Sequence, residues 1–500
     1  MRVKRLGELL SVAGLAGDGD ADAEVTGVEY DSRRCSPGSL FVAVRGFHVD
    51  GNDFIPEAVA RGAVAVVSEH SAPAAGVAAF FFVADSRAAL SALAAAFYDR
   101  PSDAMTVAGI TGTDGKTTTA TMLWSAWRAA GIAAGSLTTV DWRSQDVIEL
   151  NKSRQTTLEA PELHQHLAAL RGGGCSHVAL ETSSHALELH RVDDVAYRAA
   201  VFTRITSEHT DLHGSREAYL AAKTRLLHMV AARSDGIGVL DATDDFAFPS
   251  LSRIPVSTQL TYSTDPARRA DVVAKHVRTS ARGVHVSART PWGAAELSLQ
   301  LAGRFNAANA LAALTAGCAT GAPLDDAVRG LEGLERVRGR MERVDLGQPY
   351  TVVIDYAHTA DSLSHVLRDL RDTTAGRLWV VFGSAGERDV EKRSAMGAVA
   401  AELADVSVIT DEDPRTEDRL RILEQIAAGA TDAGGRRGEN VVVVPDRTEA
   451  IDFAISHAIG GDTVLLAGKG HESTLIIGTK SLAWDERGVA EAAIRKHLDH

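Results

Sequence analysis

Residues 107–119 read Val-Ala-Gly-Ile-Thr-Gly-Thr-Asp-Gly-Lys-Thr-Thr-Thr. The first four residues have the apolar character of a buried strand, and a helical run follows from Ala120 to Ala130. Between them, small residues allow backbone N–H groups to close around phosphate oxygens at a helix N-terminus. Lys116 adds a point charge, and the Thr117 hydroxyl can reach a magnesium ion. The stretch therefore predicts a phosphate-binding loop.

The loop departs from the full Walker pattern at one place, because Ile110 stands where that pattern has its first glycine. An incidental Gly/Thr turn is the alternative interpretation. We favour the phosphate loop because the strand, the Gly115-Lys116-Thr117 segment and the helix arrive in the order that the mechanism requires.

The length and charge of the chain narrow its class. Its 500 residues are too many for one hydrophobic core, so we expect about three domains. Lys plus Arg number 52 against 66 for Asp plus Glu, which gives a net charge of −14. So acidic a chain lacks the broad basic surface of a nucleic-acid binder, and we expect no nucleic-acid partner. An anionic ligand would need a local site.

The cysteines and apolar runs indicate a cellular compartment. Cys35, Cys175 and Cys318 lie far apart, without the paired spacing of zinc sites or disulfide frameworks, which fits a reducing environment. The N-terminal Leu-Gly-Glu-Leu-Leu run (6–10) contains a charge, which favours an amphipathic helix over a signal peptide. The apolar run 74–84 is well below the roughly 20 residues of a membrane span. We expect a soluble, cytoplasmic protein with no membrane span.

The first domain is predicted over residues 1–102. Short β-rich runs (40–44, 64–67 and 80–83) alternate there with Ala-rich helical runs (54–61 and 87–98). Arg100-Pro101-Ser102 is a plausible linker. The pattern predicts a small α/β domain.

The second domain is predicted over residues 103–337, where strand and helix patterns alternate. Alternation of this kind predicts a doubly wound, mostly parallel sheet with ligands at the carboxyl ends of its strands. Glu181 and Thr203 fall at such ends, and His209 and Lys223 follow in polar sequence. A carboxylate and an imidazole near a phosphate loop suit a nucleotide-bound magnesium site, although Mg²⁺ itself favours oxygen ligands.

The third domain is predicted over residues 338–500 as a second, Rossmann-like α/β unit. Its predicted strands are 351–354, 378–382, 406–410, 441–444 and 464–466. Polar or glycine-rich loops, 383–389, 411–415 and 468–472, follow three of these strands. We expect them to share one rim of a sheet. The predicted fold class is α/β, with a central P-loop domain flanked by a small N-terminal and a Rossmann-like C-terminal domain.

These ordered motifs resemble those of the Mur ligases, the ATP-dependent amide-forming enzymes of peptidoglycan precursor synthesis. The similarity extends over nearly the whole chain and is strongest to the tripeptide-synthetase (MurE-type) branch. The matching segments are Asp31-Ser-Arg33, Gly112-Thr-Asp-Gly-Lys-Thr117, Glu181-Thr-Ser-Ser-His185, Tyr219 to Lys223, Gly339-Arg-Met-Glu342, Asp355-Tyr-Ala-His-Thr359, Gly386-Glu-Arg-Asp389, Asp413-Pro-Arg415 and Gly468-Lys-Gly-His-Glu472.

The resemblance implies a set of ligand contacts. ATP would be held by Gly112, Thr113, Asp114, Gly115, Lys116, Thr117, Thr118, Asn306, Arg340, Asp355 and His358. The UDP-muramoyl-dipeptide acceptor would be contacted by Ser32, Thr156, Thr157, Ser184 and Arg191. The amino-acid pocket would be lined by Arg388, Asp413, Arg415, Gly468 and Glu472.

It also implies a Mg²⁺ site formed by Thr117, Glu181, His209 and Lys223, with Lys223 as a carbamate. Lys116, Lys223 and His209 would be the catalytic side chains. The carbamate has a physical rationale, because CO₂ converts a cation that would repel Mg²⁺ into an anion that helps to bind it. We further expect a monomer.

Two questions stay open at this point. Folylpolyglutamate synthesis, P-loop kinase activity and non-catalytic nucleotide sensing are alternative functions. The added diamino acid is also open. Asp413 favours a side-chain ammonium, as in L-lysine or L-ornithine, whereas Arg415 favours the distal carboxylate of meso-diaminopimelate. A buried Asp413–Arg415 pair would leave the pocket nearly neutral.

Overall fold

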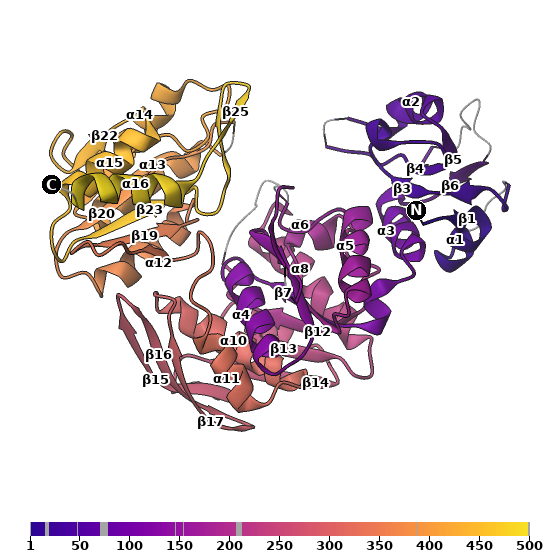
Figure 1. The fold of residues 1–500 in the computed structure, drawn as a ribbon, viewed down its shortest axis with the longest axis horizontal. Coiled ribbons are helices and arrows are strands. Elements are labelled where there is room, and N and C mark those ends of the chain that lie inside the picture. The colour runs from indigo at the N-terminus through magenta and orange to yellow at the C-terminus, as the bar shows by residue number, and fades with distance from the viewer. Residues whose placement is uncertain are drawn as a thin grey trace. The chain divides into compact units, whose positions relative to one another are not determined.

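The computed structural model describes residues 2–15, 20–47, 49–70, 79–145, 147–153, 155–206, 213–387 and 389–498. Internal contacts group the chain into two compact units, residues 1–262 with 312–327 and residues 263–311 with 328–500. Figure 1 labels their helices and strands. Among the described residues, no helix is both long enough and apolar enough to cross a membrane.

The N-terminal domain is a parallel sheet covered on both faces. Its strands pair in the order β3 (Gly27–Glu29), β4 (Ser39–Val42), β5 (Ala63–Ser68), β6 (Ala79–Phe82). Alternate residues of β4 enter opposite cores: Leu40 packs with α1 (Leu6–Val12) and α3 (Ser86–Phe97), and Phe41 packs with α2 (Ile55–Ala60). The amphipathic helix expected near the N-terminus is therefore confirmed as α1.

The P-loop domain contains a mostly parallel sheet, as predicted. Within the first unit its strand order is β10 (Ile148–Leu150), β9 (Asp141–Arg143), β8 (Ala134–Leu137), β11 (His177–Glu181), β7 (Thr106–Thr111), β12 (Tyr197–Phe202), β13 (Ile237–Asp241), β14 (Thr258–Ser263). Strands β8, β11, β7, β12, β13 and β14 run parallel, whereas β9 and β10 are antiparallel additions. The doubly wound prediction is confirmed here.

Helices cover both faces of this sheet. The helix α4 (Lys116–Ala129) packs on β7, β8 and β11, and the Nε1 of its Trp127 donates to Thr320 Oγ1 at 2.9 Å. On the other face, α5 (Ala160–Gly172), α6 (Ser184–Glu188) and α8 (Arg216–Ala231) contribute leucines and valines to one core. Both faces of the sheet are therefore buried, as is usual for a parallel sheet.

One part of the second region differs from the strand-then-helix expectation. Strands β15 (Val272–Ser280), β16 (Gly283–Thr290) and β17 (Gly293–Leu299) form an antiparallel meander. Val284, Val286 and Ala288 are buried in alternation with more exposed neighbours, which is the period of a strand. The prediction of continued βα alternation was wrong here. The helices α10 (Phe305–Ala319) and α11 (Leu324–Glu332) follow.

The C-terminal domain has the sheet order β18 (Glu342–Val344), β19 (Thr351–Asp355), β23 (Thr463–Ala467), β20 (Leu378–Phe382), β21 (Val406–Ile409), β22 (Val441–Val443), with only the described β18 pairing antiparallel. One face packs against α12 (Ala360–Arg371), α13 (Glu391–Leu403) and α14 (Arg419–Asp432). The other packs against α15 (Arg447–His457) and α16 (Glu486–Leu498), so the sheet lies between two helical layers (Figure 1). This confirms the Rossmann-like prediction.

The remaining elements are short. They are β1 (Lys4–Arg5), β2 (Glu24–Val25), α9 (Phe248–Leu251), the hairpin β24 (Thr474–Ile477) with β25 (Lys480–Ala483), and the 3₁₀ turns Ser32–Arg34, Gly51–Phe54 and Pro101–Ala104.

The sheet topology collects the polar strand ends. In the P-loop domain, β7 lies between β11 and β12, so Glu181, the last residue of β11, and Thr203, which follows β12, lie on either side of the strand that leads into the phosphate loop. In the C-terminal domain, β23, β20 and β21 are parallel neighbours, so the loops after them share one edge. The predicted rim of three loops is therefore confirmed.

Candidate active site

The phosphate loop connects β7 to α4 through closely packed backbone. Gly115 has a φ of +83°, and a Cβ at Gly112 would lie 1.8 Å from Thr203 Oγ1, so both positions need glycine. The Lys116 ammonium donates to the carbonyls of Gly112 (3.1 Å) and Thr113 (2.7 Å). The loop thus places a lysine and a helix N-terminus together, as phosphate binding requires.

Residues that follow β12 form hydrogen bonds with this loop. Thr203 Oγ1 donates to the Asp114 carbonyl at 2.6 Å. The backbone N–H of Thr206 donates to Thr113 Oγ1 at 2.9 Å. Sequence reasoning placed Thr203 at a strand end but gave it no role, because its bond to residue 114 depends on the pairing of β12 with β7.

An oxygen-rich corner lies beside the loop. The Thr117 hydroxyl lies 3.1 and 3.0 Å from the two carboxylate oxygens of Glu181, both residues being buried. The N–H of Thr139 donates to Glu181 Oε2 at 2.9 Å. A hydroxyl and a carboxylate are the oxygen ligands that Mg²⁺ prefers, so these residues fit that ion. His209, which was also predicted to bind the metal, lies outside the described residues.

Lys223 lies on α8 and is buried, with its ammonium donating to the Gly112 carbonyl at 2.8 Å and lying 4.4 Å from the Tyr219 ring centroid. The Lys116 ammonium donates to the same carbonyl oxygen. Two ammonium groups therefore converge on Gly112, and their charges repel each other unless an anion lies between them or one charge is removed.

The predicted acceptor residues of the P-loop domain gather next to Glu181. Thr157 Oγ1 donates to the Glu181 carbonyl at 2.8 Å, and Arg191 Nη1 donates to the Thr157 carbonyl at 3.1 Å. Arg191 also forms an ion pair with Glu159 at 2.7 Å. Thr156 is the half-buried residue before Thr157. The structure thus brings Thr156, Thr157 and Arg191 to the Glu181 strand end.

Two further acceptor candidates have their own partners. Ser184 Oγ lies 3.2 Å from His213 Nε2 at the start of α6. Ser32, in the N-terminal domain, is buried, and its hydroxyl donates to Glu57 Oε2 at 2.8 Å. Ser32 begins a 3₁₀ turn of the N-terminal domain, and its hydrogen bond to Glu57 lies within that domain, so its assignment rests on the resemblance alone.

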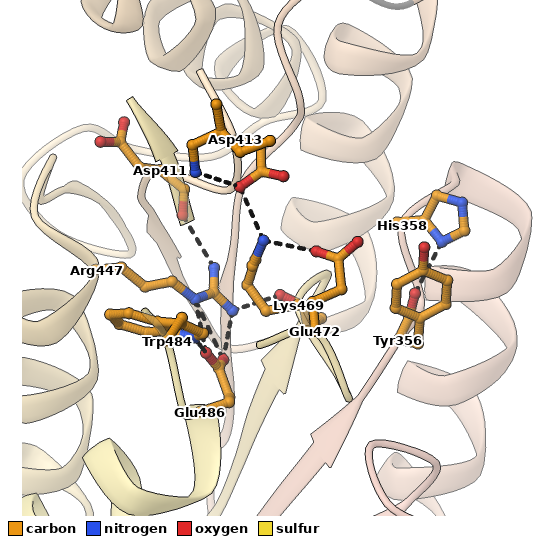
Figure 2. Close-up of polar contacts among 11 residues, drawn as sticks. Tyr356, His358, Asp411, Asp413, Arg447, Lys469, Glu472, Trp484 and Glu486 are labelled. Atoms are coloured by element: carbon orange, nitrogen blue, oxygen red, sulfur yellow. Dashed lines mark hydrogen bonds and ion pairs between the residues drawn. The ribbon is translucent and has the colours of Figure 1, made fainter. Parts of the chain in front are cut away.

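In the second unit, the predicted nucleotide residues surround Tyr356. Asp355 accepts hydrogen bonds from the N–H groups of Met341 and Ala357, each at 2.8 Å. The Arg340 guanidinium lies 4.6 Å from the Tyr356 ring centroid. The ring centroids of His358 and Tyr356 are also 4.6 Å apart, and Figure 2 shows these two side chains next to each other.

Asn306, also predicted to bind the nucleotide, is buried at the start of α10. Its amide donates to the Ala302 carbonyl at 2.6 Å and accepts from Asn309 at 2.9 Å.

The predicted amino-acid pocket contains a buried cation that pairs with two acids. The Lys469 ammonium lies 2.9 Å from Asp413 Oδ1 and 2.6 Å from Glu472 Oε2 (Figure 2). Burial raises the pKa of Glu472, against the lowering effect of Lys469. Gly468 has a φ of +98°, and a Cβ there would lie 3.0 Å from Glu412 Oε2. The loop after β23 therefore depends on glycine.

Arg415 does not form the suggested ion pair with Asp413. Asp413 pairs with Lys469 rather than with Arg415, so the suggested Asp413–Arg415 cancellation is wrong. Arg415 has a φ of +56° and donates its N–H to the Ile476 carbonyl at 3.1 Å. Arg388 lies outside the described residues.

The sequence pattern did not predict Lys469 as a partner of Asp413, although a glycine stands on either side of this lysine. Gly468 and Gly470 both have positive φ, and this left-handed backbone turns the lysine inward, where its side chain is fully buried. A lysine between two glycines after a buried strand is the signal that could have indicated this.

Fold and site together define a nucleotide-binding enzyme of the P-loop α/β class with a separate cluster of charged side chains in its last domain. Three family models match the chain: "Mur ligase family, catalytic domain" over residues 24–98, "Mur ligase middle domain" over 110–317 and "Mur ligase, glutamate ligase domain" over 339–470. The chain belongs to the Mur ligase family, whose members are ATP-dependent amide-forming enzymes, and the resemblance noted above is confirmed.

Individual relatives match along almost the full length. A "UDP-N-acetylmuramyl-tripeptide synthetase" from Roseiflexus sp. is 46% identical over 489 residues, covering 94% of each chain. A "UDP-N-acetylmuramoyl-L-alanyl-D-glutamate--2,6-diaminopimelate ligase" from Geobacillus kaustophilus is 39% identical, covering 95% of each. A solved structure with the same ligase title is 28% identical, with a TM-score of 0.68 over 99% of both chains.

Proposed function

We propose that this chain is the MurE-type ligase that joins a diamino acid to UDP-N-acetylmuramoyl-L-alanyl-D-glutamate, using ATP, in peptidoglycan precursor synthesis. The names of the full-length relatives support the substrate. The observation that carries the proposal is the cluster at the phosphate loop, where Lys116 and Lys223 both contact Gly112 and Thr117 contacts Glu181. We expect it to act in the cytoplasm as a monomer.

The proposed reaction has two steps. An oxygen of one of the two free carboxylates on the acceptor's terminal glutamate attacks the γ-phosphorus of ATP, which forms an acyl phosphate and releases ADP. The amine of the diamino acid then attacks the acyl carbon, loses a proton and expels phosphate, so that an amide remains. Catalysis is then mainly positioning and charge neutralisation, which Lys116 and the N-terminus of α4 supply.

The magnesium and nucleotide contacts follow the same assignment. Thr117 and Glu181 would hold Mg²⁺, with His209 and Lys223 completing its surroundings, and the ion would neutralise phosphate charge. The other phosphate-loop residues proposed to contact ATP are Gly112, Thr113, Asp114, Gly115, Lys116 and Thr118. In the second unit, we assign Asn306, Arg340, Asp355 and His358 to the nucleotide.

Carbamylation of Lys223 fits the charges around it. Its ammonium shares the Gly112 carbonyl with the Lys116 ammonium in a buried setting, which disfavours two positive charges. Conversion of Lys223 to a carbamate replaces this repulsion with attraction and adds oxygen atoms suited to Mg²⁺. Lys223 is therefore proposed as the modified residue.

The remaining assignments concern the two other substrates. We assign the acceptor to Ser32, Thr156, Thr157, Ser184 and Arg191. We assign the diamino acid to Arg388, Asp413, Arg415, Gly468 and Glu472.

An omission assay tests the function. Purified protein is incubated with ATP, Mg²⁺, the UDP-muramoyl-dipeptide and one diamino acid, and released phosphate and product mass are followed. We expect phosphate release to need both acceptor and amino acid, with a product heavier than the acceptor by the amino acid minus water. Phosphate release at the same rate with and without the amino acid would contradict the ligase proposal and favour a kinase or ATPase.

A further inference from the structure

A buried arginine at the first turn of α15 connects the loops of the proposed amino-acid pocket. Arg447 is fully buried, with 1% of its surface exposed. Its guanidinium donates through Nη1 to the Asp411 carbonyl at 3.1 Å and through Nη2 to the Ala467 carbonyl at 2.8 Å. One side chain thus holds backbone oxygens from two separate segments (Figure 2).

Those two carbonyls stand at the points where the pocket loops begin. Asp411 closely follows β21 and directly precedes Glu412 and Asp413, whereas Ala467 ends β23 and directly precedes Gly468. Beyond each anchor the backbone becomes irregular, since Arg415 and Gly468 have φ values of +56° and +98°. Strands β21 and β23 are not adjacent, because β20 lies between them. Arg447 therefore joins loops that the sheet itself does not join directly.

The charge of Arg447 is balanced within the same cluster. Glu486, at the start of α16 and 1% exposed, accepts from Arg447 Nη2 at 2.5 Å and from Nε at 3.0 Å. The indole N–H of Trp484 donates to Glu486 Oε2 at 2.7 Å and fixes the carboxylate. A buried ion pair of this kind adds little net stability by itself, but removal of one partner leaves an uncompensated charge. The Arg447–Glu486 pair therefore matters for the orientation of the guanidinium rather than for its net contribution to stability.

We propose that Arg447 is a positioning residue for the amino-acid pocket. It sets the relative placement of the Asp411–Arg415 and Gly468–Glu472 loops, and Glu486 and Trp484 orient its guanidinium. This inference rests on the assignment of those loops to the diamino acid. Because Arg447 holds backbone of the pocket loops, its loss should weaken use of the amino acid far more than use of ATP or the acceptor.

The test compares three variants of the full-length enzyme. Arg447→Met combined with Glu486→Gln removes both buried charges and leaves an acceptor for Trp484. Arg447→Lys keeps the charge but replaces a planar fork that reaches two carbonyls with a single ammonium. Asp462→Asn is the matched control. Asp462 is buried directly before β23, at the end of the strand opposite to the pocket loops, and accepts hydrogen bonds from the N–H of Arg377 and the indole of Trp379.

The readouts are separate KM values, kcat and thermal midpoints. For the double variant we expect the amino-acid KM to rise by about tenfold or more, with the ATP and acceptor KM values within about twofold of wild type. Arg447→Lys should show a smaller rise in the same constant. Asp462→Asn should lower the thermal midpoint while leaving all three KM values unchanged.

A double variant that folds and has an unchanged amino-acid KM would overturn the inference. An equal rise in the KM values for the amino acid, ATP and the acceptor would also overturn it. If the double variant does not fold, Arg447→Lys gives the decision, because an unchanged amino-acid KM there contradicts the proposed role. Failure of the proposed function itself is recognised separately, since wild-type enzyme would then show no amino-acid-dependent phosphate release.

Discussion

The ammonium nitrogen of Lys469 lies 2.9 Å from Oδ1 of Asp413, and the lysine side chain is fully buried. The same Oδ1 accepts the N–H of Ile476, also at 2.9 Å. Asp413 is therefore engaged by a cation of the protein before any substrate arrives. The charge that an incoming diamino acid meets depends on Lys469, Asp413 and Glu472 together.

This relationship predicts the effect of Asp413→Asn on amino-acid preference. Asparagine keeps an oxygen for Lys469 and Ile476, so the fold should persist, but the pocket gains one unit of positive charge. We expect the ratio of kcat/KM for meso-diaminopimelate to that for L-lysine to rise by about tenfold, or 1.4 kcal/mol. Steady-state kinetics with meso-diaminopimelate, L-lysine and L-ornithine measures it.

Lys469→Met is the opposite change and should lower the same ratio. Equal ratios in wild type and both variants would mean that this cluster does not read substrate charge. A wild-type preference for meso-diaminopimelate above about tenfold would show that Arg415, rather than Asp413, sets the charge of the pocket.

Lys116→Ala should reduce turnover by about 10³-fold or more while leaving the fold intact, because the lysine donates to loop carbonyls and supplies charge to the transferring phosphoryl group. Phosphate release and far-UV circular dichroism measure the two effects. Lys275→Ala, at an exposed position on β15, is the control and should retain activity. Substantial turnover by Lys116→Ala would remove this residue from the mechanism.

Lys223→Ala should lose activity because the anion proposed at Mg²⁺ is lost. Short carboxylic acids added at millimolar concentration should restore part of the turnover, since they can place a carboxylate in the vacated volume, whereas chloride should not. Initial rates with and without each anion check this. An alanine variant that is active without any added acid would show that Lys223 carries no chemistry, and intact-protein mass spectrometry of wild type detects the carbamate itself.

Glu29, at the end of β3, predicts a pH effect on stability. Burial raises its pKa to about 7, from an ordinary value of 4.5, although Arg34 opposes the rise. The folded state thus keeps a proton that the unfolded state has released, so stability should fall as the pH rises from about 4.5 to 7. Glu29→Gln should remove this fall, with a gain of about 1–3 kcal/mol at alkaline pH.

Thermal midpoints of the full chain at about pH 5 and pH 8 measure the difference. Glu24→Gln, at an exposed position on β2, is the control and should follow wild type. If Glu29→Gln and wild type lose stability equally between the two pH values, Glu29 does not titrate in that range.

Much of the fold followed from local sequence pattern. Strands such as Leu378–Phe382 are continuous apolar runs because both faces of a parallel sheet are buried, and these were predicted well. The β15–β17 meander was missed because its alternation is weak, with alanine at buried positions such as Ala288 and Ala295. Small apolar residues carry little periodic signal, and here the partner strands determine the conformation.

The site divides in the same way. The phosphate loop and the strand-end Glu181 were predictable, since each depends on local sequence and on strand direction. The pairing of Asp413 with Lys469 and the bridge made by Arg447 were not, because both depend on the strand order of one sheet: the first joins residues 56 positions apart, and Arg447 reaches residues 36 and 20 positions away. Sequence spacing does not encode which loops become neighbours.

The acyl-phosphate mechanism is the central claim, and oxygen transfer tests it most directly. Both free carboxylates of the acceptor's terminal glutamate, including the one that becomes the amide, are labelled with ¹⁸O, the complete reaction is run with ATP and a diamino acid, and the released phosphate is analysed by mass spectrometry. Attack of that carboxylate on ATP predicts one ¹⁸O atom in each phosphate, with the other label retained in the new amide. Phosphate that carries no ¹⁸O although the amide product forms would contradict the account.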